Sequence, residues 1–364
     1  MIGRRTSMVR ATVLTAGIAL GTFAAHSASL TLSETGSTLI LPLFKAWVGG
    51  YAKVDPDLNV TLGATGSEAG IHQAIANQVQ IGTSDAYMSD NDALAHPHIL
   101  NIPLAISAQT VVANLPELRG ATLKLSGPVL ALIYAGTIHD WDSPRIAAIN
   151  QGVPLPHHAI VPIRRADGSG DTFVFTQFLT FSTPDQQHLS LQDFNWEGKI
   201  GYGTTVNWPS VSGGLTASGN HGMVQTLAGT PYSVGYLGAS FQADADKAGL
   251  QTAMLENQDG RFLLPTPTTV TAAAASLTPR TPPDERLTLV YAPGPDSYPL
   301  INYEYAVVSA KQPSPQMAQA ISNFLLWCIG PQGGNARSYL EPVHFIALPT
   351  PIRALSEMQI AKIQ

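Results

Sequence analysis

The sequence predicts an α/β protein built from two domains, and three observations lead to this fold class. The chain has 364 residues, more than one ordinary domain of about 150 residues needs. Hydrophobic residues make up 45% and charged residues 12%, a balance that excludes an intrinsically disordered chain. Short β-prone runs alternate with segments whose apolar residues recur at helical spacing, which is the pattern of α/β folds.

The first 28 residues are expected to be a cleaved secretory signal rather than part of the fold. Arg4, Arg5 and Arg10 form a basic stretch, residues 11–25 are apolar but too few to span a bilayer, and small residues follow. The alternative is a buried N-terminal helix. The cleavage point, between His26 and Ser29, and the export route stay open.

The cysteine count and the net charge limit the expected cellular location and partners of the protein. Cys328 is the only cysteine, so the sequence predicts no internal disulfide, no lipid anchor and a buried apolar role for this thiol. Removing residues 1–28 leaves 16 basic against 25 acidic residues, a net charge of −9. Such a surface disfavours nucleic acid and anionic membranes as partners. The mature protein is expected in the periplasm or freely secreted.

The secondary-structure elements follow from periodicity and composition. Strands are expected over residues 58–62, 110–114, 159–164, 234–237 and 300–309. Helices are expected over residues 42–53, 69–79, 172–181 (amphipathic), 316–327 and 352–363, and within the Pro- and Thr-rich stretch 265–295 around the alanines 272–275. Residues 128–134 fit either a buried strand or a helix.

The last segment is expected to return and pack on the first lobe. The chain would then cross between lobes twice, near residues 111–116 and 299–303. This predicts lobe 1 from residues 29–113 plus 300–364 and lobe 2 from residues 114–299.

Three helix starts share a design suited to an anion. Gly and Ser or Thr stand directly before a helix in residues 34–40, 63–70 and 164–172. The first turn of a helix has unpaired N–H groups and partial positive charge, and glycine lets the backbone approach a ligand. For any one of these segments taken alone, ordinary helix capping is the better explanation. Three in one chain, one beside Arg165, favour an oxyanion site.

Arg165 and Asp85 sharpen this hypothesis. The Arg165 guanidinium can bind an oxyanion through two N–H groups, or pair with Asp167, and the two roles are compatible. An ionised Asp85 only accepts hydrogen bonds, so beside an anion it favours one that carries a proton, as phosphate does and sulfate does not. The alternative is that Asp85 caps the turn before Met88.

Six segments resemble the phosphate-specific substrate-binding proteins of ABC transporters, a family with the type II periplasmic binding protein fold. They are TGSTLILPLFKAW (35–47), GATGSEAGIHQAIANQVQIGTSDAYMSD (63–90), IVPIRRADGSGDTFVFTQFL (160–179), GTTVNWP (203–209), SGNHGMV (218–224) and INYEYAVV (301–308). The resemblance implies two discontinuous α/β lobes joined by a two-strand hinge, with phosphate in the cleft. It implies no cofactor and a partner in the membrane, the transporter permease subunits with their ATPase.

The resemblance also implies the ligand contacts. They are Thr38, Leu39 through its backbone N–H, Ser67, Asp85 as proton acceptor, Arg165, Ser169 and Gly170. The chain has Asp171 where many relatives have threonine. Two hypotheses fit Asp171: it is a second acceptor for a phosphate proton, or it turns away and caps the helix.

The expected function is phosphate binding by a monomer without catalysis. Other functions are also compatible with the sequence. An extracellular phosphate-ester hydrolase or scavenger on the same fold would need a metal cluster or an activated nucleophile. The close histidine pairs are His96 with His98 and His157 with His158, which are more typical of exposed loops than of metal ligands. Arsenate, which is protonated like phosphate, stays open as a ligand, as does an adhesive or signalling role.

Overall fold

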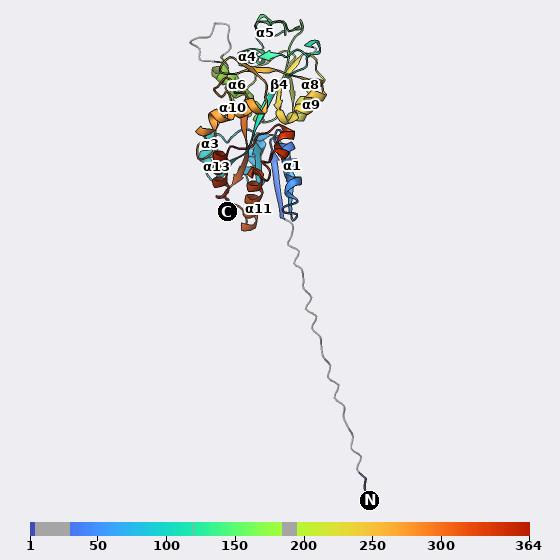
Figure 1. Ribbon diagram of the computed structural model, residues 1–364, viewed down its shortest axis with the longest axis vertical. Coiled ribbons are helices and arrows are strands. Elements are labelled where there is room, and N and C mark those ends of the chain that lie inside the picture. Colours follow the sequence, from blue (N-terminus) through green and yellow to red (C-terminus); the bar gives the residue numbers. More distant parts are fainter. Residues whose placement is uncertain (4–29, 119, 184–194) are drawn as a thin grey trace.

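The computed structural model describes residues 1–3, 30–118, 120–183 and 195–364 (Figure 1). Most of the expected signal, residues 4–28, lies outside the described residues, so its cleavage stays a prediction. No helix among the described residues is long and apolar enough to cross a membrane. Cys328 is fully buried with a free thiol, as predicted.

One large sheet organises the described chain, in the strand order β2-β1-β3-β12-β4-β8-β6-β7, with β9 also paired to β4. A small second sheet has the order β11-β10-β5. The bounds are β1 (Leu30–Gly36), β2 (Leu58–Leu62), β3 (Ile81–Ser84), β4 (Ile99–Ala113), β5 (Lys124–Leu125), β6 (Val161–Arg165), β7 (Leu215–Ala217), β8 (Ser233–Gly238), β9 (Gln251–Thr252), β10 (Met254–Glu256), β11 (Phe262–Leu263) and β12 (Ile301–Ser309).

The strand directions bring two sets of carboxyl ends to face each other. Strands β1, β2 and β3 are parallel, and so are β6, β7 and β8. Between the two sets stand β12 and β4, and β3–β12, β12–β4 and β4–β8 are each antiparallel pairs. Because three successive antiparallel pairs separate the two sets, the strands of one set run opposite to those of the other. The carboxyl ends of the two sets therefore point toward each other. Ligands of open α/β sheets bind at such ends.

Helices cover both parts of this sheet. Figure 1 shows α1, α3, α11 and α13 toward one end of the molecule and α4, α5, α6, α8 and α9 toward the other. The bounds are α1 (Leu41–Tyr51), α2 (Ser67–Ile75), α3 (Asp90–Ala95), α4 (Gly127–Tyr134), α5 (Pro144–Ile149), α6 (Gly170–Ser182), α7 (Trp196–Lys199), α8 (Gly219–Ala228), α9 (Gln242–Lys247), α10 (Pro267–Leu277), α11 (Pro315–Ile329), α12 (Arg337–Leu340) and α13 (Thr350–Ile360).

The structure extends or corrects three expected elements. The expected strand at residues 110–114 is the end of β4, whose 15 residues are all buried. Pro103 hides this strand in the sequence, but it lies at the register shift between β4 and β12, where proline is tolerated. Residues 128–134 form a helix, α4, capped by Ser126.

The expected amphipathic helix at residues 172–181 is α6, and it is buried on almost every side. It has no broad polar face because it packs against β4, β8, α4 and α7. The division of the molecule into lobes of residues 29–113 plus 300–364 and residues 114–299 stays a prediction.

Candidate functional site

The facing strand ends bring the predicted site residues together. Thr38 follows β1, Ser67 follows β2 and Asp85 follows β3, whereas Arg165 ends β6 and Ser169 precedes α6. Burial is nearly complete throughout the set: the exposed fraction is 9% for Thr38, 5% for Arg165, 3% for Asp85 and 1% or less for Leu39, Ser67, Ser169 and Asp171. These residues therefore meet in the interior, between the two sets of strands.

Arg165 is the positive centre of the site. Its Nε donates to Asp167 Oδ1 at 2.8 Å, its Nη2 donates to Asp167 Oδ2, and its Nη1 donates to Asp171 Oδ2. Burial acts to raise the pKa of Asp167, but the hydrogen bonds and charge of Arg165 outweigh it and leave that pKa lowered. Tyr236 Oη accepts from the Arg165 backbone N–H at 3.1 Å and fixes the start of the loop.

Thr38 joins the two sides of the site through Asn220. Its Oγ1 accepts from the Asn220 backbone N–H at 3.1 Å and from Asn220 Nδ2 at 2.9 Å. Arg165 Nη2 lies 3.5 Å from the same oxygen. Because Asn220 opens α8, the start of a fourth helix converges on the site beside those of α1, α2 and α6.

Asp85 is held by two serine hydroxyls. Ser37 Oγ donates to Asp85 Oδ1, and Ser67 Oγ donates to Oδ2 at 3.3 Å while accepting from the Asp85 N–H at 3.2 Å. Burial raises the pKa of Asp85, and the bonds from Ser37 and Ser67 and the charge of Arg165 oppose that rise. The carboxylate is thus fixed in place but only partly compensated by positive charge.

Asp171 has one oxygen bonded and one without a donor. Its Oδ2 accepts from Arg165 and from Asn220 Nδ2 at 2.7 Å, whereas the buried Oδ1 has no hydrogen-bond partner among the described residues. Burial, followed by the charge of Asp85, raises the pKa of Asp171 to about 7. A buried acceptor without a donor is costly, so Oδ1 is suited to a ligand that brings a proton.

Glycines let the two sides approach closely. A Cβ at Gly170 would lie 2.5 Å from both Asp85 Oδ2 and Ser67 Oγ. At Gly66, where φ is +93°, a Cβ would lie 2.7 Å from the Gly168 carbonyl oxygen. Only glycine tolerates both this backbone and this contact.

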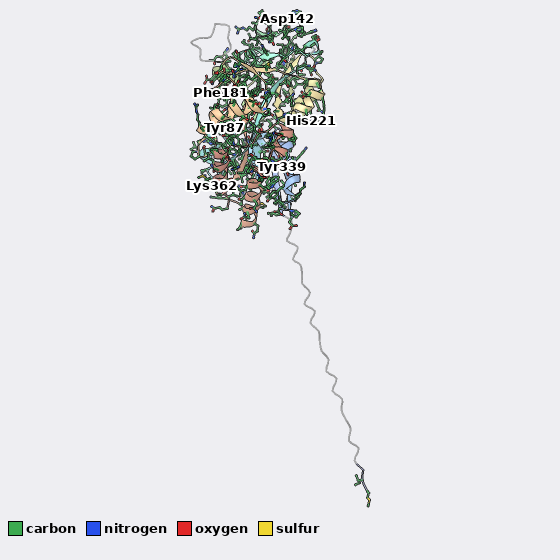
Figure 2. All side chains as sticks on the ribbon, in the orientation of Figure 1. Tyr87, Asp142, Phe181, His221, Tyr339 and Lys362 are labelled. Carbon is green, nitrogen blue, oxygen red and sulfur yellow. The ribbon has the colours of Figure 1, made fainter. Side chains whose placement is uncertain are left out.

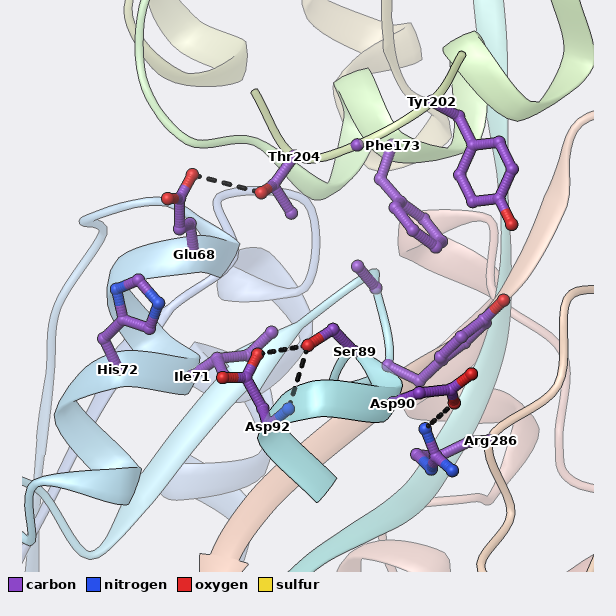
Figure 3. A pocket seen from close by; sticks show the side chains of 13 residues that line it. Glu68, Ile71, His72, Ser89, Asp90, Asp92, Phe173, Tyr202, Thr204 and Arg286 are labelled. Atoms are coloured by element: carbon purple, nitrogen blue, oxygen red, sulfur yellow. Dashed lines mark hydrogen bonds and ion pairs between the residues drawn. The ribbon is translucent and has the colours of Figure 1, made fainter. Parts of the chain in front are cut away.

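Among the hollows that border the buried centre, two lie on opposite sides of it. One of about 280 Å³ includes Thr38, Asp167 and Asn220 in its lining and also His221. The other, of about 520 Å³, is lined on one side by Glu68 and Tyr87 and is drawn in Figure 3. In Figure 2, Tyr87 and His221 lie on opposite sides of the molecule.

Comparison with known proteins places the chain in a family. Residues 22–332 match the model of the PBP superfamily domain. The chain is 31% identical over 342 residues to the phosphate-binding protein PstS of Pasteurella multocida, covering 94% of this chain and 92% of that one. Its identity to the PstS of Methanocaldococcus jannaschii is also 31%, over 88% of this chain and 83% of that one. The chain belongs to the PstS family of phosphate-binding proteins.

A solved structure supports the PstS fold. A high-affinity periplasmic phosphate-binding protein crystallised with phosphate superposes with a TM-score of 0.68 at 18% identity, covering 89% of this chain and 92% of that chain. The predicted fold class, an α/β protein of the type II periplasmic binding protein class, is confirmed.

Within this PstS fold, the sequence missed three residues that contact the predicted site. Ser37 stands directly before Thr38 in the first motif. Asn220 follows Ser218 and Gly219, the same Gly-plus-Ser design that marked the other helix starts. Glu304 lies beside Asp85, and its only signal was a charged residue inside an apolar strand. Ser37 and Asn220 could have been found from the sequence, because each lies in a segment with the Gly and Ser pattern of a helix start.

The histidine pairs lie apart from this centre. His157 Nδ1 bonds Asp142 Oδ2 at 2.8 Å, and His158 stacks on Tyr232 with ring centroids 3.8 Å apart. The rings of His96 and His98 contact each other edge to face. Within the described ranges, no group of three or more His, Cys, Asp or Glu side chains is arranged to hold a metal ion.

Proposed function

We propose that this protein binds inorganic phosphate between two lobes and delivers it to the permease subunits of an ABC transporter, which work with their ATPase. It acts as an exported monomer in the periplasm and turns over no substrate. The names of the relatives support phosphate as the ligand: the PstS proteins of Pasteurella multocida and Methanocaldococcus jannaschii are phosphate-binding proteins.

One observation carries the choice of ligand: Asp85 is buried at an anion site. Four helix starts and Arg165 attract an anion, yet Asp85 would repel one that has no proton to donate. Phosphate near neutral pH carries a proton, and sulfate does not. An ionised carboxylate accepts that proton in a hydrogen bond, whereas sulfate would leave it desolvated and unpaired.

Each predicted residue has a role in this proposal. Thr38, Ser67 and Ser169 offer hydroxyl donors, and Leu39 and Gly170 offer backbone N–H groups. Two of these donors are engaged within the protein: the Leu39 N–H donates to Ser37 Oγ at 3.0 Å, and the Ser67 hydroxyl donates to Asp85 Oδ2 at 3.3 Å. Leu39 and Ser67 would exchange these bonds for bonds to phosphate. Ser169 Oγ accepts from the Thr172 N–H at 3.2 Å as a helix cap and donates to phosphate through its hydroxyl hydrogen.

Arg165 and the two carboxylates complete the set. Arg165, oriented by Asp167, supplies the full positive charge. Asp85 accepts one phosphate proton, and Asp171 Oδ1 accepts a second when the ligand has it.

Contacts across the site support closure around the ligand. Thr38 meets Asn220, and Ser240 Oγ donates to the Leu39 carbonyl oxygen at 2.7 Å. Glu68 Oε2 accepts from Thr204 Oγ1 at 3.1 Å and from Thr205 Oγ1 at 2.8 Å. A phosphate touching both sides would stabilise the closed state, because it makes contacts there that an open state cannot offer.

Calorimetric titration of the phosphate-stripped protein with phosphate tests binding. We expect one site per chain. Arg165→Lys should weaken binding about 100-fold or more, since lysine cannot reproduce the planar donor fork. Arg261→Lys is the matched control, an exposed arginine paired with Asp296, and should bind like wild type. A wild type without phosphate binding would overturn the proposal.

Transport and catalysis need separate measurements. Deleting the gene in its native host should reduce high-affinity uptake of labelled phosphate, and unchanged uptake would refute the delivery role. Incubation with a generic phosphate ester, with and without added divalent metal, should release no phosphate above background. Steady release would point to the hydrolase alternative.

A further inference from the structure

Glu304 stands directly opposite Asp85 in the sheet. In the antiparallel pairing of β12 with β3, Tyr305 pairs with Ser84. The next residue on each strand is therefore Glu304 on β12 and Asp85 beyond β3, and opposite residues in such a pair project to the same face. The register of β12 against β4 also shifts between Glu304 and Tyr305. Irregularities of this kind re-aim side chains near binding sites.

The Glu304 side chain is fully buried, and one of its two carboxyl oxygens accepts hydrogen bonds whereas the other does not. Its Oε1 accepts from Ser107 Oγ at 2.5 Å and from Asn302 Nδ2 at 2.9 Å. Its Oε2 has no hydrogen-bond partner among the described residues, and the strand register places the side chain next to Asp85. When two buried carboxyl groups lie next to each other, the repulsion between two negative charges favours a state in which one of them keeps its proton.

The charges around the pair decide which group holds this proton. Arg165 acts on Asp85, and Ser37 and Ser67 donate to it, all of which favour its ionised form. In the described ranges, the donors to Glu304 are the neutral side chains of Ser107 and Asn302. Burial, followed by the charge of Asp85, raises the pKa of Glu304 well above its usual range.

The other elements packed on β12 add no cation toward Glu304 among the described residues. Helix α10 has no titratable side chain. On α2, Glu68 bonds Thr204 and Thr205, and His72 lines the larger hollow. Asp171 faces Asp85 from α6, and its negative charge adds to the cost of ionising a further carboxyl group in this centre.

We propose that Glu304 is a positioning residue that stays protonated and donates its hydrogen bond to Asp85, so that Asp85 remains ionised and aimed at the ligand. This inference rests on the proposed function, since the ligand it serves is phosphate. The neutral Glu304 stabilises the Asp85 charge as a neighbouring cation would, but it adds no positive charge that would also hold sulfate. When Glu304 loses its proton in alkaline solution, it places a second negative charge beside Asp85 and weakens the binding of the anion.

The test compares Glu304→Gln with Glu304→Leu in phosphate titrations between about pH 6 and about pH 9.5. Glutamine keeps a neutral donor at the same reach, so Glu304→Gln should stay within about threefold of wild type at neutral pH. Leucine leaves Asp85 without that donor, and Glu304→Leu should bind about 10- to 100-fold more weakly. The ratio of the Glu304→Gln and wild-type affinities cancels the ionisation of phosphate itself.

That ratio should move in favour of Glu304→Gln as the pH rises, because the variant has no proton to lose there. Glu285→Gln is the matched control: Glu285 is also fully buried, and Ser356 Oγ donates to it at 2.9 Å outside the site. Its affinity profile should follow wild type. A Glu304→Gln variant as weak as Glu304→Leu, or one whose profile parallels wild type at every pH, would overturn the proposal.

Carboxyl carbon NMR decides the matter if the Glu304 variants do not fold, or if wild type binds no phosphate and the proposed function itself fails. Glu34→Gln, Glu285→Gln and Glu256→Gln together remove three other glutamates whose pKa burial raises, to about 7 for Glu34 and about 8 for Glu285. In this triple variant, labelled on glutamate, one neutral carboxyl signal should remain at about pH 8.5. Absence of a neutral signal would refute a protonated Glu304.

Discussion

Arg165 donates through Nη1 to Asp171 Oδ2, and both side chains of this ion pair are only 1% exposed. The other carboxylate oxygen, Oδ1, has no donor within the described part of the chain. A buried ion pair rarely adds much stability, because desolvation offsets its Coulomb attraction. The unpaired Asp171 Oδ1 and the fixed Arg165 side chain are better explained as one half of a preorganised anion site.

Asp171 should make phosphate affinity depend on pH. Its pKa, raised by burial to about 7, means that it is neutral in mildly acidic solution and negative in alkaline solution, where phosphate is mostly a dianion. Wild-type affinity should therefore fall about tenfold between about pH 6 and about pH 8.5. In Asp171→Asn the fall should shrink to about threefold or less, measured by calorimetry at each pH.

The control for this series is Asp246→Asn, an exposed aspartate on α9 that bonds Gln242. It should keep the wild-type pH profile. Wild-type affinity that is flat across the range would refute the role of Asp171 as a second acceptor.

Gly170→Ala should weaken phosphate binding through a steric clash alone. Gly170 is not among the glycines with positive φ, so alanine is acceptable to the backbone, but its Cβ would lie 2.5 Å from Asp85 Oδ2 and Ser67 Oγ. Overpacking of this kind costs about 1–3 kcal/mol, or about 5- to 150-fold in affinity.

Gly222→Ala is the matched control, because Gly222 also lies in a helix, α8, but the nearest atom to its added Cβ is the Ala217 Cβ at 3.8 Å. Its phosphate affinity should equal that of wild type. Equal affinities for the two alanine variants would contradict the close approach of α6 to Asp85.

Glu68 should govern how long the closed state lasts. Its carboxylate accepts from the hydroxyls of Thr204 and Thr205, and its backbone N–H donates to the Gly168 carbonyl oxygen at 3.1 Å. Figure 3 shows the contact with Thr204 across the larger hollow. Glu68→Ala should raise the phosphate dissociation rate about 3- to 10-fold and leave the association rate nearly unchanged, as stopped-flow fluorescence would measure.

An exposed glutamate on α13, Glu357, provides the comparison, and Glu357→Ala should leave both rates unchanged. If Glu68→Ala slowed association instead, the contact would act in capture rather than in closure.

Glu285 should make the folded state less stable as the pH rises. Burial raises its pKa from 4.5 to about 8, so between these values the folded state holds a proton that the unfolded state has released. Stability is therefore highest below about pH 4.5, falls as the pH rises, and stops falling above about pH 8 as far as this group is concerned. Glu285→Gln should make the decline in melting temperature between about pH 5 and about pH 8.5 shallower. Melting temperatures that decline identically in wild type and Glu285→Gln would contradict this.

The sequence predicted the fold class, and it pointed to the segments that meet at the candidate site, for a physical reason. Helix starts that bind anions need Gly, Ser and Thr within a few residues, so segments such as Gly63–Gly70 are visible locally. The period-2 and helical patterns likewise predicted β2 at its observed bounds and α11 nearly so.

What the sequence could not give depends on contacts between distant segments. Nothing near Glu304 along the chain reveals that β12 places it opposite Asp85. The length of β4 was hidden by Pro103, whose tolerance depends on the register shift with β12. The burial of α6 depends on its neighbours β4, β8 and α4. The periodicity of the α6 sequence contains no information about them.

Parallel calorimetric titrations of the phosphate-stripped protein with phosphate and with sulfate, in wild type and in Asp85→Asn, test the central claim most directly. We predict one phosphate per wild-type chain and sulfate binding at least about 1,000-fold weaker. In Asp85→Asn the difference should shrink, because an asparagine amide can donate to sulfate. Equal binding of both anions by the wild type, or unchanged selectivity in Asp85→Asn, would contradict selection by a buried proton acceptor.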